Sequence, residues 1–192
     1  MTKRISEAII DSIELKQKIL NDELLLETID KVVEISTNCL KNGGKILFCG
    51  NGGSAADAQH LAAELSGRFY YDRDPLFAEA LHVNTSYLTA VANDYSYDEI
   101  YARLVKAKGR EGDVIIGIST SGNSPNILKA FDQAQKQKMI SIGMSNQTGG
   151  KMLNSCDLIL KMPSLDTPRI QEAHILVGHI ICELIEKNIF PK

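Results

Sequence analysis

The chain has no tryptophan and only 4 cysteines among its 192 residues. No two of them form a Cys-x-x-Cys pair, which argues against a disulfide-rich scaffold or a zinc ribbon. We expect buried, reduced thiols of a cytoplasmic protein at Cys39, Cys49, Cys156 and Cys182. No apolar run is long enough to span a membrane, and charges interrupt residues 1–17, so we expect neither a membrane anchor nor a secretory signal.

An excess of positive charge is also missing. The formal net charge of -3 gives no support for binding nucleic acid or an anionic membrane. The run Gly50-Asn51-Gly52-Gly53 lacks the last glycine of a dinucleotide fingerprint, GxGxxG. His82 and Asn84 stand at the end of the second predicted strand, where such a site needs an acidic residue. The sequence therefore does not predict a nucleotide cofactor.

What the chain does contain is a strand, a glycine loop and a helix within residues 45–68, KILFCGNGGSAADAQHLAAELSGR. Residues 46–49 are apolar and too short for a helix, so they favour a buried strand. The glycines that follow allow a tight turn, and Ser54 is expected to cap the next helix. A helix N-terminus behind glycines presents free N–H groups, which suits a phosphate.

The same alternation continues along the chain. Apolar runs predict strands at 46–49, 77–82, 114–118, 139–144 and 157–161. Helical patterns predict helices at 5–20, 24–41, 88–92, 97–107, 125–137 and 167–187, besides the Ala-rich helix after Ser54. We therefore expect one domain over residues 1–192: an α/β three-layer sandwich with a five-stranded parallel sheet in the flavodoxin-like order 2-1-3-4-5. Helices within residues 2–42 should pack on the sheet and on a neighbouring subunit.

A second loop rich in small residues follows the third predicted strand. It contains Ser119, Thr120, Ser121, Gly122, Asn123 and Ser124. Hydroxyls and free N–H groups ahead of a helix can surround a phosphate without a cation. The loop is not a Walker loop, because no Lys follows its glycine. The simpler alternative is that Ser124 only caps the helix.

Four polar residues on two helices have the composition of a metal site. His60 and Glu64 share a face of the glycine-loop helix, while Gln171 and His179 lie two turns apart on the last helix. His174, three residues after Gln171, could share that side. Two imidazoles, a carboxylate and an amide oxygen could hold Zn(2+), and a carboxylate with an imidazole could transfer protons. The alternative is a solvated pair of His60 and Glu64.

Several segments together resemble a known family. These are GNGGSAADAQHLAAELSGRF, AVANDY, GREGDVIIGISTSGNSPNILKA and TPRIQEAHILVGHIICELIE. They are similar to proteins of the sugar isomerase (SIS) fold, and within it to the phosphoheptose isomerases. The resemblance implies a cytoplasmic homotetramer with active sites at subunit interfaces. It also implies conversion of D-sedoheptulose 7-phosphate to D-glycero-D-manno-heptose 7-phosphate, which leads to activated heptose for lipopolysaccharide, capsule or an S-layer glycan.

The resemblance also implies roles for individual residues. Glu64 and His179 would be the acid/base pair that moves a proton through an enediol, and His60, Glu64, Gln171 and His179 would bind Zn(2+). Substrate would be held by Asn51, Gly52, Gly53, Ser54, Glu64, Arg68, Asn93, Asp94, Ser119, Thr120, Ser121, Ser124 and Gln171. One departure is Pro168, because some members carry an acidic residue just before the Arg of RIQE. Alternatives are a non-enzymatic SIS-fold adaptor that binds the replication initiator, and an isomerase or sensor of a different phosphosugar.

Overall fold

Five parallel strands form the centre of the computed structural model, which describes residues 1–192. Their order is β2-β1-β3-β4-β5, as the sequence predicts. The strands are β1 (Ile46–Gly50), β2 (Ala78–Ala80), β3 (Val114–Ile118), β4 (Ile140–Asn146) and β5 (Leu158–Met162). Successive strands are added in one direction from β1 to β2 and in the other direction from β3 onward. The parallel neighbours β1 and β3 therefore have their following loops side by side.

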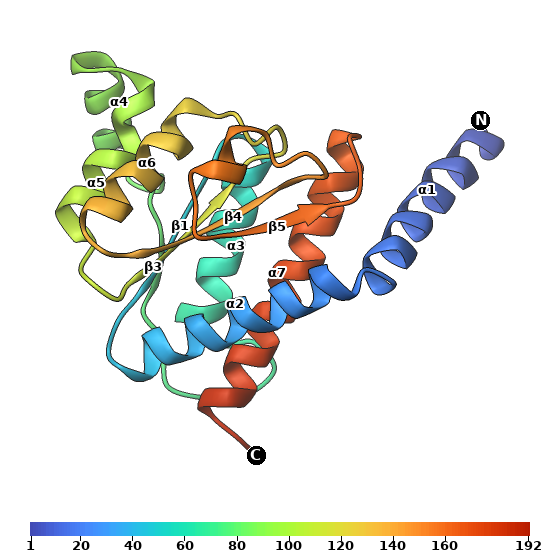
Figure 1. The fold of residues 1–192 in the computed structure, drawn as a ribbon, viewed down its shortest axis with the longest axis horizontal. Helices are drawn as coiled ribbons and strands as arrows, with labels where there is room; N and C mark the ends of the chain where they lie inside the picture. The colour runs from blue at the N-terminus through green and yellow to red at the C-terminus, as the bar shows by residue number, and fades with distance from the viewer.

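Helices cover both faces of the sheet (Figure 1). One face carries α4 (Thr85–Asp94), α5 (Ile100–Lys108) and α6 (Pro125–Lys136). The other carries α2 (Glu23–Lys41), α3 (Gly53–Ser66) and α7 (Thr167–Ile189), with α1 (Thr2–Leu20) at its margin. Short 3₁₀ turns span Tyr97–Glu99 and Gly150–Asn154. The predicted three-layer α/β architecture is confirmed.

The strands divide their side chains between two cores. Alternate residues of β1 point to opposite faces, so Ile46 and Phe48 join the core under α3 and α7 while Leu47 and Cys49 join the core under α5 and α6. All five residues of β1 are buried. A strand buried on both faces explains why residues 46–49 read as a continuous apolar run.

Some element boundaries differ from the prediction. The helix after the glycine loop begins at Gly53, and its N-cap is Gly52 with a φ of 58°, so the prediction of Ser54 as the cap was wrong. The left-handed conformation of Gly52 turns the chain into the helix earlier. The second strand is shorter than residues 77–82, and α4 is longer than residues 88–92 because the Asn84 side chain accepts a hydrogen bond from the Tyr87 N–H.

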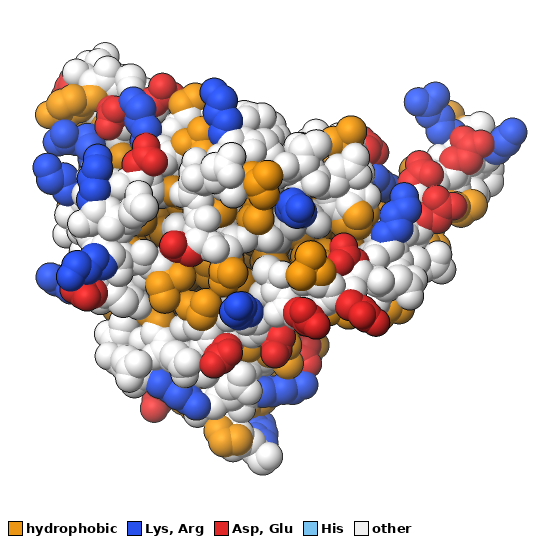
Figure 2. Space-filling view, in the orientation of Figure 1, with side chains coloured by type: hydrophobic (Ala, Val, Ile, Leu, Met, Phe, Trp, Pro, Cys, Tyr) orange, Lys and Arg blue, Asp and Glu red, His pale blue; other side chains and the backbone are white.

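Helix α1 extends away from the rest of the structure as an arm (Figure 1). Figure 2 shows charged side chains along this arm. Its apolar residues Ile5, Ile9, Ile10 and Ile13 are exposed, whereas Leu15 and Ile19 near its end are buried. No helix combines the length and apolar character that a membrane span requires. The thiols are free as predicted, and all are buried except the half-buried Cys156.

Candidate active site

The glycine loop makes a tight turn between β1 and α3. A Cβ at Gly50 would collide with the backbone oxygen of Ser54, so only glycine allows this close approach. The Ser54 N–H donates to the carbonyl of Asn51 at 3.1 Å. The side chain of Gln171, from the start of α7, packs against Gly53, where a Cβ would lie 3.2 Å from Gln171 Oε1. The loop and the first turn of α7 therefore fit together closely.

Two helices bring three titratable side chains to one point. His60 and Glu64 are one turn apart on α3, and His60 Nε2 lies 2.9 Å from Glu64 Oε1. His179, on α7, places its Nε2 3.1 Å from His60 Nε2. The two imidazole rings are T-shaped, with centroids 4.9 Å apart. The side chains of His60 and Glu64 are 49% and 24% exposed, so the group is open to a ligand from solvent.

The close approach of α3 and α7 depends on Gly178. A Cβ at this position would lie 2.6 Å from Leu61 Cδ1, which is well inside normal contact distance. Leu61 follows His60, and Gly178 precedes His179. The glycine therefore lets the two helices touch beside the two histidines.

The three side chains suit a divalent cation. One ligand atom from each of His60, Glu64 and His179 lies within 4.8 Å of the others. A tetrahedral zinc ion with Zn–N bonds of about 2.0–2.1 Å separates its ligand atoms by about 3.3 Å, close to the spacing that the two imidazoles already have. Two imidazoles and a carboxylate are also a typical zinc donor set. These three residues therefore fit zinc, whereas the side chain of Gln171, the fourth predicted ligand, packs against Gly53 at the start of α3.

The serine-rich loop after β3 forms a cluster of hydroxyl groups. Ser119 Oγ lies 2.9 Å from Ser124 Oγ and 3.4 Å from Ser121 Oγ. Ser124 is the N-cap of α6, but its side chain makes no capping hydrogen bond. The hydroxyls therefore face one another ahead of the helix, and the simpler prediction that Ser124 serves only as a cap does not describe the loop.

A network that the sequence reasoning missed joins the two loops. Asn51 and Asn126 exchange side-chain hydrogen bonds of 2.9 and 2.8 Å, and the Tyr97 hydroxyl donates to Asn51 Oδ1 at 3.1 Å. Asn126, just inside α6, is 1% exposed. This leaves one N–H of the Asn51 amide for a ligand. An Asn directly after the loop proline was the available signal, but nothing in a single sequence pairs it with Asn51.

Other predicted residues lie outside these contacts. Arg68 is exposed just beyond α3, and Asn93 and Asp94 are exposed at the end of α4, where the Asn93 amide donates to Asp94 at 2.9 Å. Thr120 is half-buried in the serine-rich loop. The expectation that His174 shares the face of Gln171 and His179 was wrong, because His174 is fully buried and its Nε2 lies 3.3 Å from the carbonyl of Ser145 on β4. Burial lowers the pKa of His174 to about 4.

Fold and site together define an SIS-domain protein, and a family model described as SIS domain matches residues 9–146. The phosphoheptose isomerase of Aneurinibacillus thermoaerophilus is 51% identical over 190 residues, covering 99% of this chain and 96% of its own length. That of Clostridium acetobutylicum is 53% identical over 190 residues, covering 99% and 97%. A solved phosphoheptose isomerase from Neisseria gonorrhoeae, 43% identical, superimposes with a TM-score of 0.90 over 97% of this chain and 98% of that chain. The chain belongs to the phosphoheptose isomerase family.

Proposed function

We propose that the protein isomerises D-sedoheptulose 7-phosphate to D-glycero-D-manno-heptose 7-phosphate, the first step toward an activated heptose. The observation that carries this proposal is the meeting of Glu64 and His179, from two different helices on one face of the sheet. An isomerase of this kind needs a carboxylate and an imidazole side by side. The relatives named phosphoheptose isomerase, which match almost the full chain, support the same reaction.

The phosphate would bind at the serine-rich loop, through Ser119, Thr120, Ser121 and Ser124. Neutral hydroxyls and the N-terminus of α6 supply donors there. The rest of the substrate would contact the glycine loop and nearby polar groups, which are Asn51, Gly52, Gly53, Ser54, Arg68, Asn93, Asp94 and Gln171. Binding the remote phosphate would place C1 and C2 of the sugar against Glu64.

Glu64 would take the proton from one of these two carbons and return it to the other, through an enediol. His179 would exchange protons with the two substrate oxygens. The His60 imidazole lies within hydrogen-bond distance of both groups, so it orients them. Proton transfer by positioned side chains contributes about 10²–10⁴-fold to a rate.

Zinc would be held by His60, Glu64 and His179, with Gln171 as the proposed fourth ligand. When bound, it would polarise the carbonyl of the substrate. A carboxylate held tightly by a metal is a weaker base, so Glu64 must serve two competing purposes. Metal analysis of protein purified without a chelator or a metal-affinity tag tests this: we expect one zinc per chain, and full activity with no bound metal would leave His60 an orienting role only.

The whole chain would act as one domain in a cytoplasmic homotetramer, with active sites at subunit interfaces. The exposed isoleucines of α1 are the surface that supports this assembly. Sedimentation of the purified protein would measure the number of subunits directly. A monomer with full activity would contradict the proposal that a neighbouring subunit completes the site.

The decisive variant is Glu64→Gln, which removes the proton carrier while keeping the size of the side chain. We expect turnover to fall at least about 10³-fold with little change in substrate affinity, since only the transition state needs the carboxylate. Purified protein incubated with sedoheptulose 7-phosphate and followed by NMR measures this. Near-normal turnover in the variant would refute the assignment of Glu64. The same assay distinguishes the enzyme from a non-enzymatic adaptor, which the full-length match to phosphoheptose isomerases does not favour.

A further inference from the structure

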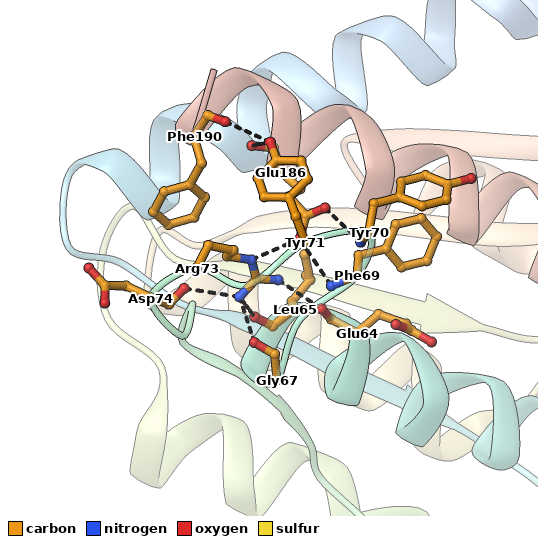
Figure 3. Close-up of polar contacts among 10 residues, drawn as sticks. All are labelled: Glu64, Leu65, Gly67, Phe69, Tyr70, Tyr71, Arg73, Asp74, Glu186 and Phe190. Atoms are coloured by element: carbon orange, nitrogen blue, oxygen red, sulfur yellow. Dashed lines mark hydrogen bonds and ion pairs between the residues drawn. The ribbon is translucent and has the colours of Figure 1, made fainter. Parts of the chain in front are cut away.

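A buried ion pair lies between α3 and α7, away from the three side chains of the site. Arg73 Nε donates to Glu186 Oε1 at 3.0 Å, and the two side chains are only 2% and 0% exposed. Figure 3 shows both at the centre of a network of polar contacts. Glu186 belongs to α7, whereas Arg73 lies in the segment that follows α3.

Arg73 holds the C-terminal end of α3. Its Nη2 donates to the carbonyl of Glu64 at 2.8 Å, and its Nη1 lies 2.7 Å from the carbonyl of Leu65 and 2.9 Å from that of Gly67. The last carbonyls of a helix have no partner within the helix and carry partial negative charge, so a guanidinium at this end is doubly favourable. One of these acceptors is the backbone of Glu64 itself. Arg73 therefore fixes the turn that presents the carboxylate.

Glu186 holds the chain on the other side of the pair. Its Oε1 accepts from the N–H of Phe69 at 3.0 Å, and its Oε2 accepts from the N–H of Tyr70 at 2.8 Å. Burial would raise the pKa of Glu186, but hydrogen bonds from Tyr70 and Phe69 and the charge of Arg73 outweigh it and lower that pKa. The carboxylate is therefore charged at neutral pH and ties the segment after α3 to α7.

The ion pair is the last of three contacts that set α3 against α7. Gln171 packs on Gly53 at the first contact, and Leu61 packs on Gly178 at the second, beside the two histidines. The third joins Glu186 to Phe69 and Arg73. The two helices thus run side by side in the same direction, and the site lies between the first contact and the third.

Stability alone does not account for a pair of this kind. Removing two charges from water is costly, and apolar residues of similar size often stabilise a protein as well or better. The pair contributes geometric specificity, because the planar guanidinium forms good hydrogen bonds with its partners in only a few arrangements. The geometry of the ion pair constrains both the rotation of α3 about its own axis and the position of α3 along the axis of α7.

We propose that Arg73 and Glu186 are positioning residues for the reaction: they hold the last turn of α3 against α7 so that Glu64 and His60 meet His179. The rate measurement below rests on the proposed isomerase function. A second measurement, on the histidine side chains, does not depend on it.

The test variant is the double substitution Arg73→Met with Glu186→Gln, which leaves no unpaired buried charge. The matched control is Lys45→Met with Asp113→Asn. This second ion pair, with an N–O distance of 2.6 Å and side chains 12% and 4% exposed, joins the residues just before β1 and β3. Both double variants neutralise one buried pair, but only the first contacts α3 and α7.

We expect kcat to fall about 10- to 100-fold in the first variant with KM changed less than about threefold, because a displacement near 1 Å costs this much. The control should keep kcat even where its melting temperature falls. In chelator-treated protein, imidazole NMR signals of His60 and His179 should shift in the first variant and not in the control. Arg73→Lys, which keeps the charge but loses the planar fork, should be intermediate in both measurements.

Unchanged kcat and unshifted imidazole signals in the first variant would overturn the proposal, and so would an equal loss of kcat in the control. If Arg73→Met with Glu186→Gln does not fold, Arg73→Lys decides alone, and wild-type behaviour of that variant contradicts the proposal. If the wild-type protein itself shows no isomerase activity, the proposed function fails, while the imidazole comparison still decides the role of the ion pair.

Discussion

Replacing Gly178 by Ala tests how closely the chemistry depends on the packing of α3 against α7. The added Cβ would lie 2.6 and 2.7 Å from the two methyl carbons of Leu61. Carbon atoms in contact prefer about 3.5–4.0 Å, so the helices or the leucine must move by about 1 Å. Leu61 is 2% exposed and has little space to move into. We therefore expect most of the movement to separate the two helices.

The expected effect on stability is small because two terms oppose each other. Alanine is better than glycine inside a helix by about 1 kcal/mol, whereas overpacking a core costs about 1–3 kcal/mol. The net loss in unfolding free energy is about 0–2 kcal/mol. The effect on geometry is larger. The distance between His60 Nε2 and His179 Nε2, now 3.1 Å, would increase by about 1 Å and would then exceed a hydrogen-bond distance. A misplacement of this size lowers kcat by about 100-fold.

Steady-state kinetics and chemical denaturation of Gly178→Ala measure the two effects. Adding Leu61→Ala removes the conflict, so the double variant should regain kcat to within about threefold while losing about 2–5 kcal/mol of stability. Gly109→Ala is the control: its Cβ would meet Met139 in the core on the other face of the sheet, so stability should fall at unchanged kcat. A folded Gly178→Ala protein with wild-type kcat, or a double variant that regains nothing, would show that the reasoning is wrong.

Three further predictions follow from single contacts. Ser119→Ala removes a hydroxyl from the phosphate loop, so KM should rise about 10-fold or more with little loss of stability, and an unchanged KM in kinetic assays would contradict that role. Asn126→Ala frees the side chain of Asn51, so KM should rise while the melting temperature changes little. Burial lowers the pKa of His174 from 6.5 to about 4, so the unfolded chain binds a proton at a higher pH than the folded protein does. The free energy of unfolding should therefore drop by about 3 kcal/mol as the pH falls through the range between these two pKa values. Denaturation of His174→Leu should show a flatter pH dependence.

The arrangement of strands could be predicted because each local signal acts within a few residues. The run from Ile46 to Cys49 is apolar because β1 is buried on both faces, and the glycines after it mark the turn. Right-handed crossovers then limit the possible strand orders, and the observed order is the predicted one. The start of α3 was harder, because Gly52 takes up the turn that Ser54 was expected to begin.

Helical periodicity predicted part of the site and failed for His174. With about 100° per residue, eight residues place Gln171 about 80° from His179, so the two remain on neighbouring faces. Five residues place His174 about 140° from His179, on the side that meets the sheet. That side is apolar and buried, which explains why the imidazole of His174 is held neutral there. His174 lies about 60° from Gln171 but on the side away from His179, so the spacing from Gln171 alone was a misleading signal.

The contacts between α3 and α7 could not be predicted, because each joins residues more than a hundred positions apart in the sequence. Charged residues are seldom buried, so Arg73 and Glu186 resemble ordinary surface residues in a linear sequence. Glu186 did carry one signal, since it lies four residues after the buried Cys182 and therefore on the apolar face of α7. A lone carboxylate on such a face needs a buried cation or several N–H donors. In this structure it has both, and they come from the segment that ends the helix bearing Glu64.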